Sequence, residues 1–134
     1  MISRRRKLVH TGFRSGFEQK LAGEIEACGL NVCYEDTRFK YLVPERQSHY
    51  TPDFRIEKSG GDIFIEAKGR MDAACRQKHI LLKQQHPDLD LRFVFMNQNQ
   101  KLYKGSNTTL AQWAEQHGFV YAHKHIPQEW LQGE

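Results

Sequence analysis

Apolar residues recur along the chain with two kinds of spacing, one typical of helices and one typical of strands. Near the N-terminus they stand three or four residues apart, at Phe17, Leu21, Ile25 and Cys28. This spacing places them on one face of a helix, and Gly29 directly after them is a common end of a helix. The pattern predicts a first helix over residues 15–28.

Two further helices are indicated downstream. Residues 72–86 mix apolar with basic side chains and precede Pro87, through which a helix does not continue. Residues 108–117 begin with two threonines, either of which can cap a helix, and precede Gly118, a second common end.

Apolar stretches in the remaining sequence predict strands. They cover residues 30–34, 39–43, 91–96 and 119–122, of which 91–96 is the most apolar and the expected central strand. Pro44 and the four residues after it interrupt the pattern, and a proline there suits an edge strand or a connection. Helices that alternate with strands predict an α/β sandwich around a small mixed sheet.

Residues 51–69 have the pattern of a β-hairpin. A turn-rich segment at 58–62 is flanked by apolar residues on both sides. Side chains alternate between the faces of a strand, so Glu66 and Lys68 point the same way, and pairing of the two strands brings Asp53 opposite Glu66. We therefore expect two carboxylates and one ammonium group in a single patch.

Two neighbouring carboxylates suit a hard divalent cation, which prefers oxygen ligands and keeps waters that can act as nucleophiles. A lysine beside them offers positive charge to a phosphate. The alternative is an ordinary solvated surface, since acidic and basic residues on a hairpin face usually form weak ion pairs. Pro52 before Asp53, the apolar second strand and the Glu66-x-Lys68 ending favour the functional interpretation only when taken together.

Glu18 has a structural alternative of its own. The sequence Ser15-Gly16-Phe17-Glu18 matches the capping box, in which the serine caps the helix and the glutamate bonds back to the backbone. An acidic residue in the first turn also interacts favourably with the helix dipole, without any catalytic task. Local sequence leaves both roles of Glu18 open.

The chain has 134 residues, which fits a single domain, and a formal net charge of +4, which favours an anionic partner. Much of the positive charge stands at the N-terminus, in Arg4, Arg5, Arg6 and Lys7, followed by Arg14. This run is typical of a mobile arm that follows phosphates, although a solvated tail has the same composition. Other basic residues placed to contact a nucleic-acid backbone are Lys78, Lys101 and Lys104.

Composition argues against several classes of protein. No apolar run approaches membrane-spanning length and no hydrophobic signal region follows the basic N-terminus, so we expect a cytosolic protein. Cys28, Cys33 and Cys75 form no C-x-x-C pair and indicate neither a disulfide framework nor a zinc site. His123 and His125 lack a clear third ligand, which favours a surface role over a metal site.

Six short motifs stand in order along the chain. They are Phe13-Arg14-Ser15-Gly16-x-Glu18, Tyr50-Thr51-Pro52-Asp53-Phe54, Glu66-x-Lys68-Gly69, Gln85-His86-Pro87-x-Leu89-Asp90, Lys101-Leu102-Tyr103-Lys104-Gly105-Ser106 and Ile126-Pro127-x-Glu129-Trp130. In this order they resemble the endonuclease I family of bacteriophages, whose members resolve four-way DNA junctions. The resemblance implies an α/β, restriction-endonuclease-like fold, with a mixed sheet flanked by helices, in a symmetric homodimer.

The resemblance also implies the roles of four residues, Glu18, Asp53, Glu66 and Lys68. Asp53 would bind and bridge two metal ions, Glu66 and the Ala67 carbonyl would complete one of them, and Glu18 would help to hold the other. Lys68 would orient the attacking water and stabilise charge on the transition state. The expected ion is Mg²⁺, with Mn²⁺ as a substitute, and no small-molecule cofactor is expected.

A domain-swapped arrangement is implied as well. Residues 13–43 would be exchanged between subunits through a bridging strand at about 41–49, so that Glu18 and Asp53 of one site come from different chains. In this organisation residues 1–12 are a basic flexible arm and residues 13–134 a single nuclease domain.

The expected function is that of a structure-selective, metal-dependent DNA endonuclease that resolves four-way junctions by paired nicks near the branch point. Two alternatives stay open: a related nuclease that cuts linear duplex, and a DNA-binding module without catalysis. Cleavage of linear duplex would indicate the first alternative, and junction binding without metal-dependent turnover the second.

Overall fold

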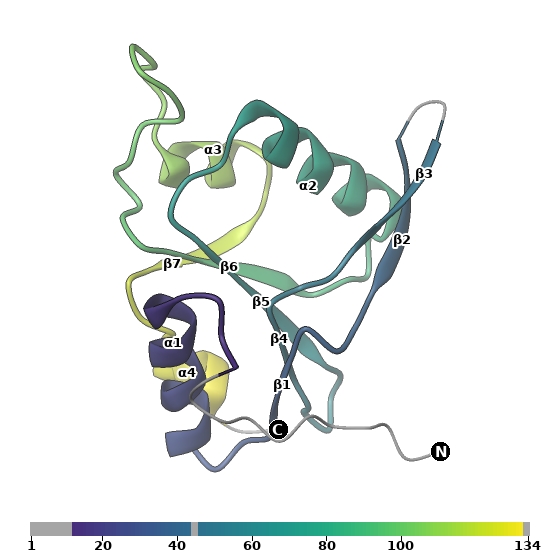
Figure 1. Ribbon diagram of the computed structural model, residues 1–134, viewed down its shortest axis with the longest axis vertical. Helices are drawn as coiled ribbons and strands as arrows, with labels where there is room; N and C mark the ends of the chain where they lie inside the picture. Colours follow the sequence, from purple (N-terminus) through teal and green to yellow (C-terminus); the bar gives the residue numbers. More distant parts are fainter. Residues whose placement is uncertain (1–11, 44–45, 133–134) are drawn as a thin grey trace.

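The computed structural model describes residues 12–43 and 46–132 (Figure 1). The predicted N-terminal arm falls outside this part except for Gly12, and with it the basic residues Arg4, Arg5, Arg6 and Lys7. Within the described part of the chain, no helix is both long and apolar enough to cross a membrane.

A five-stranded mixed sheet runs through the centre of the molecule (Figure 1). Its strands are, in spatial order, β1 (Val32–Tyr34), β4 (Phe54–Ile56), β5 (Ile63–Lys68), β6 (Leu91–Phe95) and β7 (Val120–His123). The pairs β1–β4 and β4–β5 are antiparallel, whereas β5–β6 and β6–β7 are parallel because helical crossovers connect them. The most apolar run of the sequence forms β6, which lies inside the sheet as predicted.

Helices cover both faces of the sheet, as the sequence predicts (Figure 1). The helices are α1 (Gly16–Ala27) and α4 (Gln128–Leu131) on one face, and α2 (Ala73–Gln85) and α3 (Leu110–Gln116) on the other. Alternation along β5 divides its side chains between two cores. Ile63 and Ile65 belong to the core against α1, here called the α1 core, and Phe64 belongs to the core against α2, the α2 core.

The strands β2 (Phe39–Val43) and β3 (Arg46–Tyr50) form a separate antiparallel hairpin. The predicted interruption over residues 44–48 is wrong for residues 46–48, because Arg46 already pairs with Val43 and the strand continues from there. Residues 44–45, between the strands, lie outside the described residues. The hairpin is tied to α2 by the Gln85 side chain, which bonds the backbone N–H and carbonyl of Leu42 at 2.6 and 2.8 Å.

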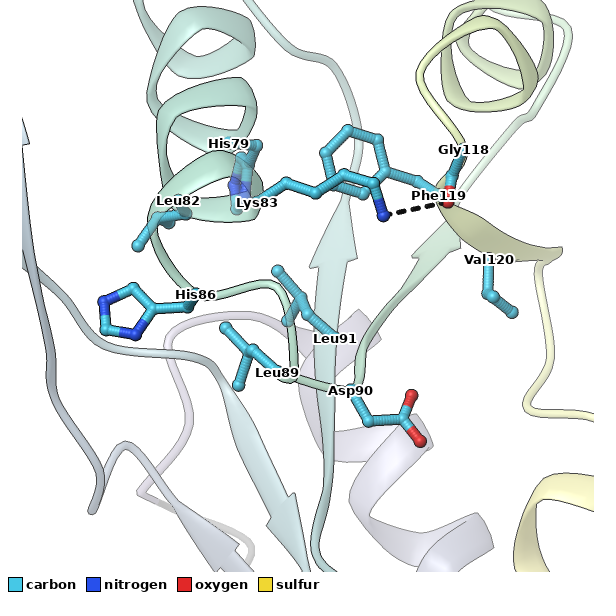
Figure 2. Close-up of a pocket in the computed structure, with 10 residues that line it drawn as sticks. All are labelled: His79, Leu82, Lys83, His86, Leu89, Asp90, Leu91, Gly118, Phe119 and Val120. Atoms are coloured by element: carbon cyan, nitrogen blue, oxygen red, sulfur yellow. Dashed lines mark hydrogen bonds between the residues drawn. The ribbon is translucent and has the colours of Figure 1, made fainter.

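His79, on α2, is fully buried between aromatic rings. Its ring centre lies 5.0 Å from that of Tyr50 and 4.8 Å from that of Phe93, in edge-on contacts. Neither ring nitrogen has a hydrogen-bond partner among the described residues, and burial lowers the pKa of His79 to about 2. The neutral imidazole lines a small cavity of about 100 Å³, and Phe119 also lines this cavity (Figure 2).

We predict that His79→Leu makes the stability of the protein less sensitive to acid. The folded state keeps this imidazole neutral, whereas the unfolded chain protonates it below its ordinary pKa of about 6.5. Stability is therefore lost as the pH falls below about 6.5, by up to about 1.4 kcal/mol per pH unit. Urea unfolding at pH 7 and pH 5 gives the free energies of unfolding that test this.

Between those two pH values the wild type should lose about 2 kcal/mol more than His79→Leu. His49→Gln is the matched control, because that histidine is exposed and its replacement should leave the acid sensitivity of the wild type in place. Equal losses in the wild type and in His79→Leu would contradict the prediction.

Candidate active site

The hairpin of β4 and β5 brings Asp53 and Glu66 together. Phe54 pairs with Ile65 across the two strands, so the residues next to them, Asp53 and Glu66, face each other at the end of the ladder. The Asp53 N–H donates to Glu66 Oε1 at 3.3 Å, and the Ala67 N–H donates to Asp53 Oδ2 at 2.9 Å. Both carboxylates are buried. This is the strand pairing that the sequence predicts.

Lys68 completes the patch from the same strand. Its Nζ lies 3.0 Å from Glu66 Oε2, and both side chains are largely shielded from solvent. Burial lowers the pKa of Lys68, but Glu66 and Cys75 together outweigh that effect, and the net pKa lies above its ordinary value. The side chain therefore carries a positive charge at neutral pH.

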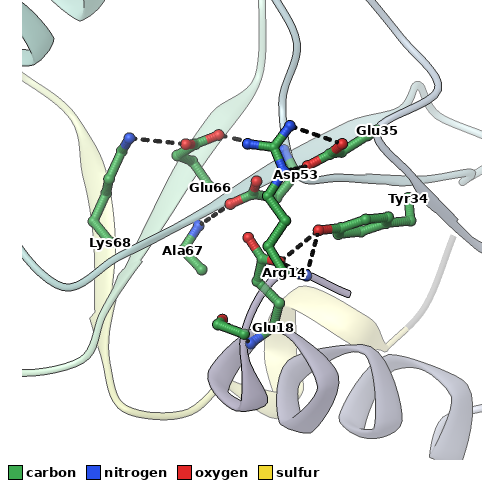
Figure 3. A network of polar contacts seen from close by, with 9 residues as sticks. Arg14, Glu18, Tyr34, Glu35, Asp53, Glu66, Ala67 and Lys68 are labelled. Carbon is green, nitrogen blue, oxygen red and sulfur yellow. Dashed lines mark hydrogen bonds and ion pairs between the residues drawn. The ribbon is translucent and has the colours of Figure 1, made fainter. Parts of the chain in front are cut away.

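Glu18 reaches the patch from the first turn of α1. Ser15 caps the helix by accepting the Glu18 N–H at 3.1 Å, as the capping motif predicts. The carboxylate of Glu18, however, accepts the Arg14 N–H at 3.0 Å and the Tyr34 hydroxyl at 2.5 Å, both through Oε1. Of the two capping-box bonds, the one to the Ser15 side chain caps the helix. The buried Glu18 carboxylate is instead turned toward Tyr34 on β1 (Figure 3).

Each of the two glutamates is held by a tyrosine. Tyr34 at the end of β1 donates to Glu18, and Tyr50 at the end of β3 donates to Glu66 Oε1 at 2.5 Å. Burial is the largest cause that raises the pKa of both phenols, and the adjoining glutamates add to it. The hydroxyls therefore remain protonated donors at neutral pH and fix one oxygen of each glutamate.

A further carboxylate, Glu35, lies in the same cluster. Glu18, Glu35 and Asp53 each present an oxygen within 4.8 Å of the other two, a spacing at which one cation could bind all three. The Glu35 N–H donates to the Asp53 carbonyl at 2.9 Å, and Glu35 has a left-handed backbone with φ of 49°. Arg14 closes the cluster on its outer side, with Nε 3.0 Å from Glu35 Oε2 (Figure 3).

Crowding of carboxylates has a direct effect on Asp53. Burial raises its pKa and the neighbouring Glu66 raises it further, while the bond from the Ala67 N–H lowers it. The net value is about 8, so Asp53 is mostly protonated at neutral pH in the metal-free protein. A bound dication would favour the ionised form and release this proton.

We predict that Asp53→Asn stabilises the metal-free protein at pH 7. The carboxylate has a higher pKa in the folded state than in the unfolded chain, so wild-type stability is lost as the pH rises from about 4 to about 8. An amide removes this loss and can still accept the Ala67 N–H. Thermal unfolding in EDTA should show a gain of about 1–4 kcal/mol.

The exposed Asp88 supplies the control, because Asp88→Asn should leave the unfolding temperature nearly unchanged. Adding Mg²⁺ should then stabilise the wild type more than Asp53→Asn, since the expected ion would bind the folded state through this carboxylate. A lower unfolding temperature for Asp53→Asn than for the wild type in EDTA would refute the prediction.

Comparison with known proteins identifies the family. The model of the phage endonuclease I family matches residues 1–134, the whole chain. The chain belongs to this family. It is 46% identical over 115 residues to the endodeoxyribonuclease 1 of Enterobacteria phage T3, which covers 86% of this chain and 74% of that protein. It is 42% identical over 119 residues to the endonuclease I of Escherichia phage T7, covering 89% and 78%.

The family membership confirms the resemblance seen in the six motifs. In this member of the family, Glu18, Asp53, Glu66 and Lys68 lie in one patch of a single chain. Sequence reasoning missed Tyr34, Tyr50 and Glu35. Tyr50 stands three residues before Asp53 inside a recognised motif, whereas nothing local marks Tyr34 or Glu35, because they reach the site through the pairing of β1 with β4.

The residues predicted to contact nucleic acid have different surroundings. Arg14 is 76% exposed but pairs with Glu35. The Lys78 ammonium lies 5.4 Å from the centre of the Tyr50 ring and shares a hollow with Lys68. Lys101 and Lys104 are exposed in the long connection before α3. Their contacts with DNA stay predictions.

Proposed function

We propose that the protein is a deoxyribonuclease that uses divalent metal ions to resolve four-way DNA junctions, by paired nicks near the branch point. The observation that carries the proposal is the meeting of buried carboxylates with Lys68 in one patch of a phage endonuclease I chain. The relatives from phages T3 and T7 bear the names endodeoxyribonuclease 1 and endonuclease I, which supports DNA as the substrate.

The donor set fits a hard divalent cation because its side-chain ligands are all oxygens. Glu18, Glu35 and Asp53 form one cluster, and Glu66 lies beside Asp53. We expect Asp53, Glu66 and the Ala67 carbonyl to hold one Mg²⁺ ion and Glu18 to help hold a second, with Mn²⁺ as a substitute. When bound, the ions would supply a nucleophilic water and stabilise charge on the attacking and leaving oxygens.

Lys68 serves in this proposal as a fixed positive charge. Its raised pKa keeps the ammonium protonated, which suits it to donate hydrogen bonds to a phosphate oxygen or to the attacking water and not to accept a proton. The ion pair with Glu66 holds it beside the carboxylates. Charge that develops on the phosphate would then face a donor already in position.

Two such sites in a symmetric homodimer would match the two strands that a four-way junction presents for cleavage. We propose that residues 13–43 are exchanged between the subunits of that dimer, with a connection at about 41–49. Glu18 of one chain would then complete the site formed by Asp53, Glu66 and Lys68 of its partner. The carboxylate cluster that Glu18 and Glu35 form with Asp53 in one chain would then be formed between two chains.

Junction cleavage tests the proposal directly. With Mg²⁺, the wild type should place paired nicks near the branch of a labelled synthetic four-way junction and leave a linear duplex of the same sequence largely uncut. Lys68→Met should slow nicking by about 100-fold or more, because a preorganised donor to the transition state is lost, while junction binding measured in EDTA is retained.

Lys83→Met is the matched control, since the Lys83 ammonium bonds the Gly118 carbonyl at 3.2 Å, outside the patch, and its loss should leave nicking nearly unchanged. Equal cutting of linear duplex would instead favour a nuclease for linear DNA. Junction binding with no turnover in Mg²⁺ or Mn²⁺ would favour a binding module.

Mixed dimers test the exchange of residues 13–43. Glu18→Ala and Asp53→Ala subunits should each be inactive alone, because each lacks a carboxylate of every site. After subunit exchange, a swapped heterodimer contains one site with both wild-type residues, so nicking of a single strand should return to about half the wild-type rate per dimer. If both residues of a site came from the same chain, the mixture would stay inactive.

A further inference from the structure

A groove lies between the start of α2 and the segment around residues 101–105. Its volume is about 650 Å³, and its lining includes Arg70, Arg76, Leu102, Tyr103 and Lys104. We call the groove that these five residues line the Tyr103 groove. The connection that carries Tyr103 projects from the body of the molecule beside α2 and α3 (Figure 1).

Tyr103 is an exposed aromatic residue on a well-braced segment. Its side chain is 61% exposed. The segment is braced on both sides of it, because the Leu102 N–H donates to the Thr108 carbonyl at 3.0 Å and the Ser106 N–H donates to the Tyr103 carbonyl at 3.0 Å. The backbone that carries this exposed ring is thus braced, and the ring belongs to neither hydrophobic core.

The charge around this ring is positive. The Arg76 guanidinium carbon lies 5.9 Å from the centre of the Tyr103 ring, within the range of a cation–π contact. Arg70 and Lys104 are exposed, and neither pairs with a carboxylate among the described residues. The one acid in the lining, Asp72, accepts the Cys75 N–H at 2.8 Å and caps α2.

The Tyr103 groove adjoins a hollow that reaches Lys68. Arg70 also lines a second hollow, of about 500 Å³, which reaches Lys68 and adds the cations Arg46 and Lys78. A run of positive charge therefore leads from the lysine of the active site to the exposed ring. A phosphate-bearing chain with flat apolar groups fits such a track, because cations bind its backbone and an aromatic face stacks on its bases.

We propose that the Tyr103 groove binds an unstacked nucleotide of the DNA substrate, with the base on the Tyr103 ring and the flanking phosphates on Arg70 and Lys104. The proposal rests on the proposed function. Bases inside a linear duplex are covered on both faces by their neighbours, whereas a branch point or a gap exposes a base. The groove would therefore contribute to selection of branched DNA over linear duplex.

Binding of a fluorescent probe tests this. The probe is a four-way junction with two unpaired nucleotides at the branch, one of them 2-aminopurine, and it is titrated with full-length protein in EDTA to prevent cleavage. Tyr103→Ala should weaken binding by about 5- to 100-fold, whereas Tyr103→Phe, which keeps the ring, should bind nearly as the wild type does. Stacking on the ring should quench the fluorescence with the wild type and Tyr103→Phe only.

Two further measurements separate stacking from charge. Linear duplex binding should change less than about 2-fold in Tyr103→Ala, since no base is exposed there. Lys104→Gln should lower the slope of log affinity against log salt by about one for the junction probe, because one phosphate contact is lost. Circular dichroism melting confirms that the exposed substitutions leave the fold intact.

A gapped duplex carrying unpaired 2-aminopurine distinguishes this proposal from the proposed function. Quenching that depends on Tyr103 supports binding of a base in the Tyr103 groove, even if the wild type does not prefer junctions. That second result would contradict the proposed junction selectivity and leave the groove proposal standing. The proposal is overturned if Tyr103→Ala binds and quenches both probes as the wild type does, or if the wild type binds neither probe.

Discussion

The proximity of two buried carboxyl groups governs the candidate active site. Asp53 and Glu66 are both buried and close enough for the backbone of one to bond the carboxylate of the other. Such a pair resists ionisation, which is why the pKa of Asp53 is raised to about 8 by burial and by Glu66. The protein offsets the repulsion with Lys68 and Tyr50 on Glu66 and with the Ala67 N–H on Asp53. In the proposed function, the repulsion that remains would favour the binding of a cation.

The position of this site follows from the way β5 divides two cores. Tyr34, which holds Glu18, belongs to the α1 core, and Tyr50, which holds Glu66, belongs to the α2 core. The two glutamates are therefore anchored from opposite faces of the sheet, and Asp53 lies between them at the end of the β4–β5 ladder. Packing of each core fixes one side of the site, so that loosening of either core would displace a carboxylate.

Local pattern was sufficient for the hairpin, because register in a two-stranded unit follows from alternation and a turn. It was also sufficient for the cap that Ser15 gives to α1. It was not sufficient for Glu35, which enters the site through the antiparallel pairing of β1 with β4 and a left-handed backbone. Nor did the pattern indicate the strand at residues 46–48, because these residues are polar and follow a proline, whereas β3 begins at Arg46.

The contacts of the candidate site fall into two sets, one within the residues proposed to be exchanged and one outside them. Glu18, Tyr34, Glu35 and Arg14 bond one another and all lie within residues 13–43. Asp53, Glu66, Lys68 and Tyr50 form a second set, which begins at the last residue of β3 and continues beyond it. The sets meet through the carboxylate cluster and the bond from the Glu35 N–H to the Asp53 carbonyl. Exchange of residues 13–43 would therefore move the first set as a unit and open the β2–β3 ladder, without rearranging the internal contacts of either set.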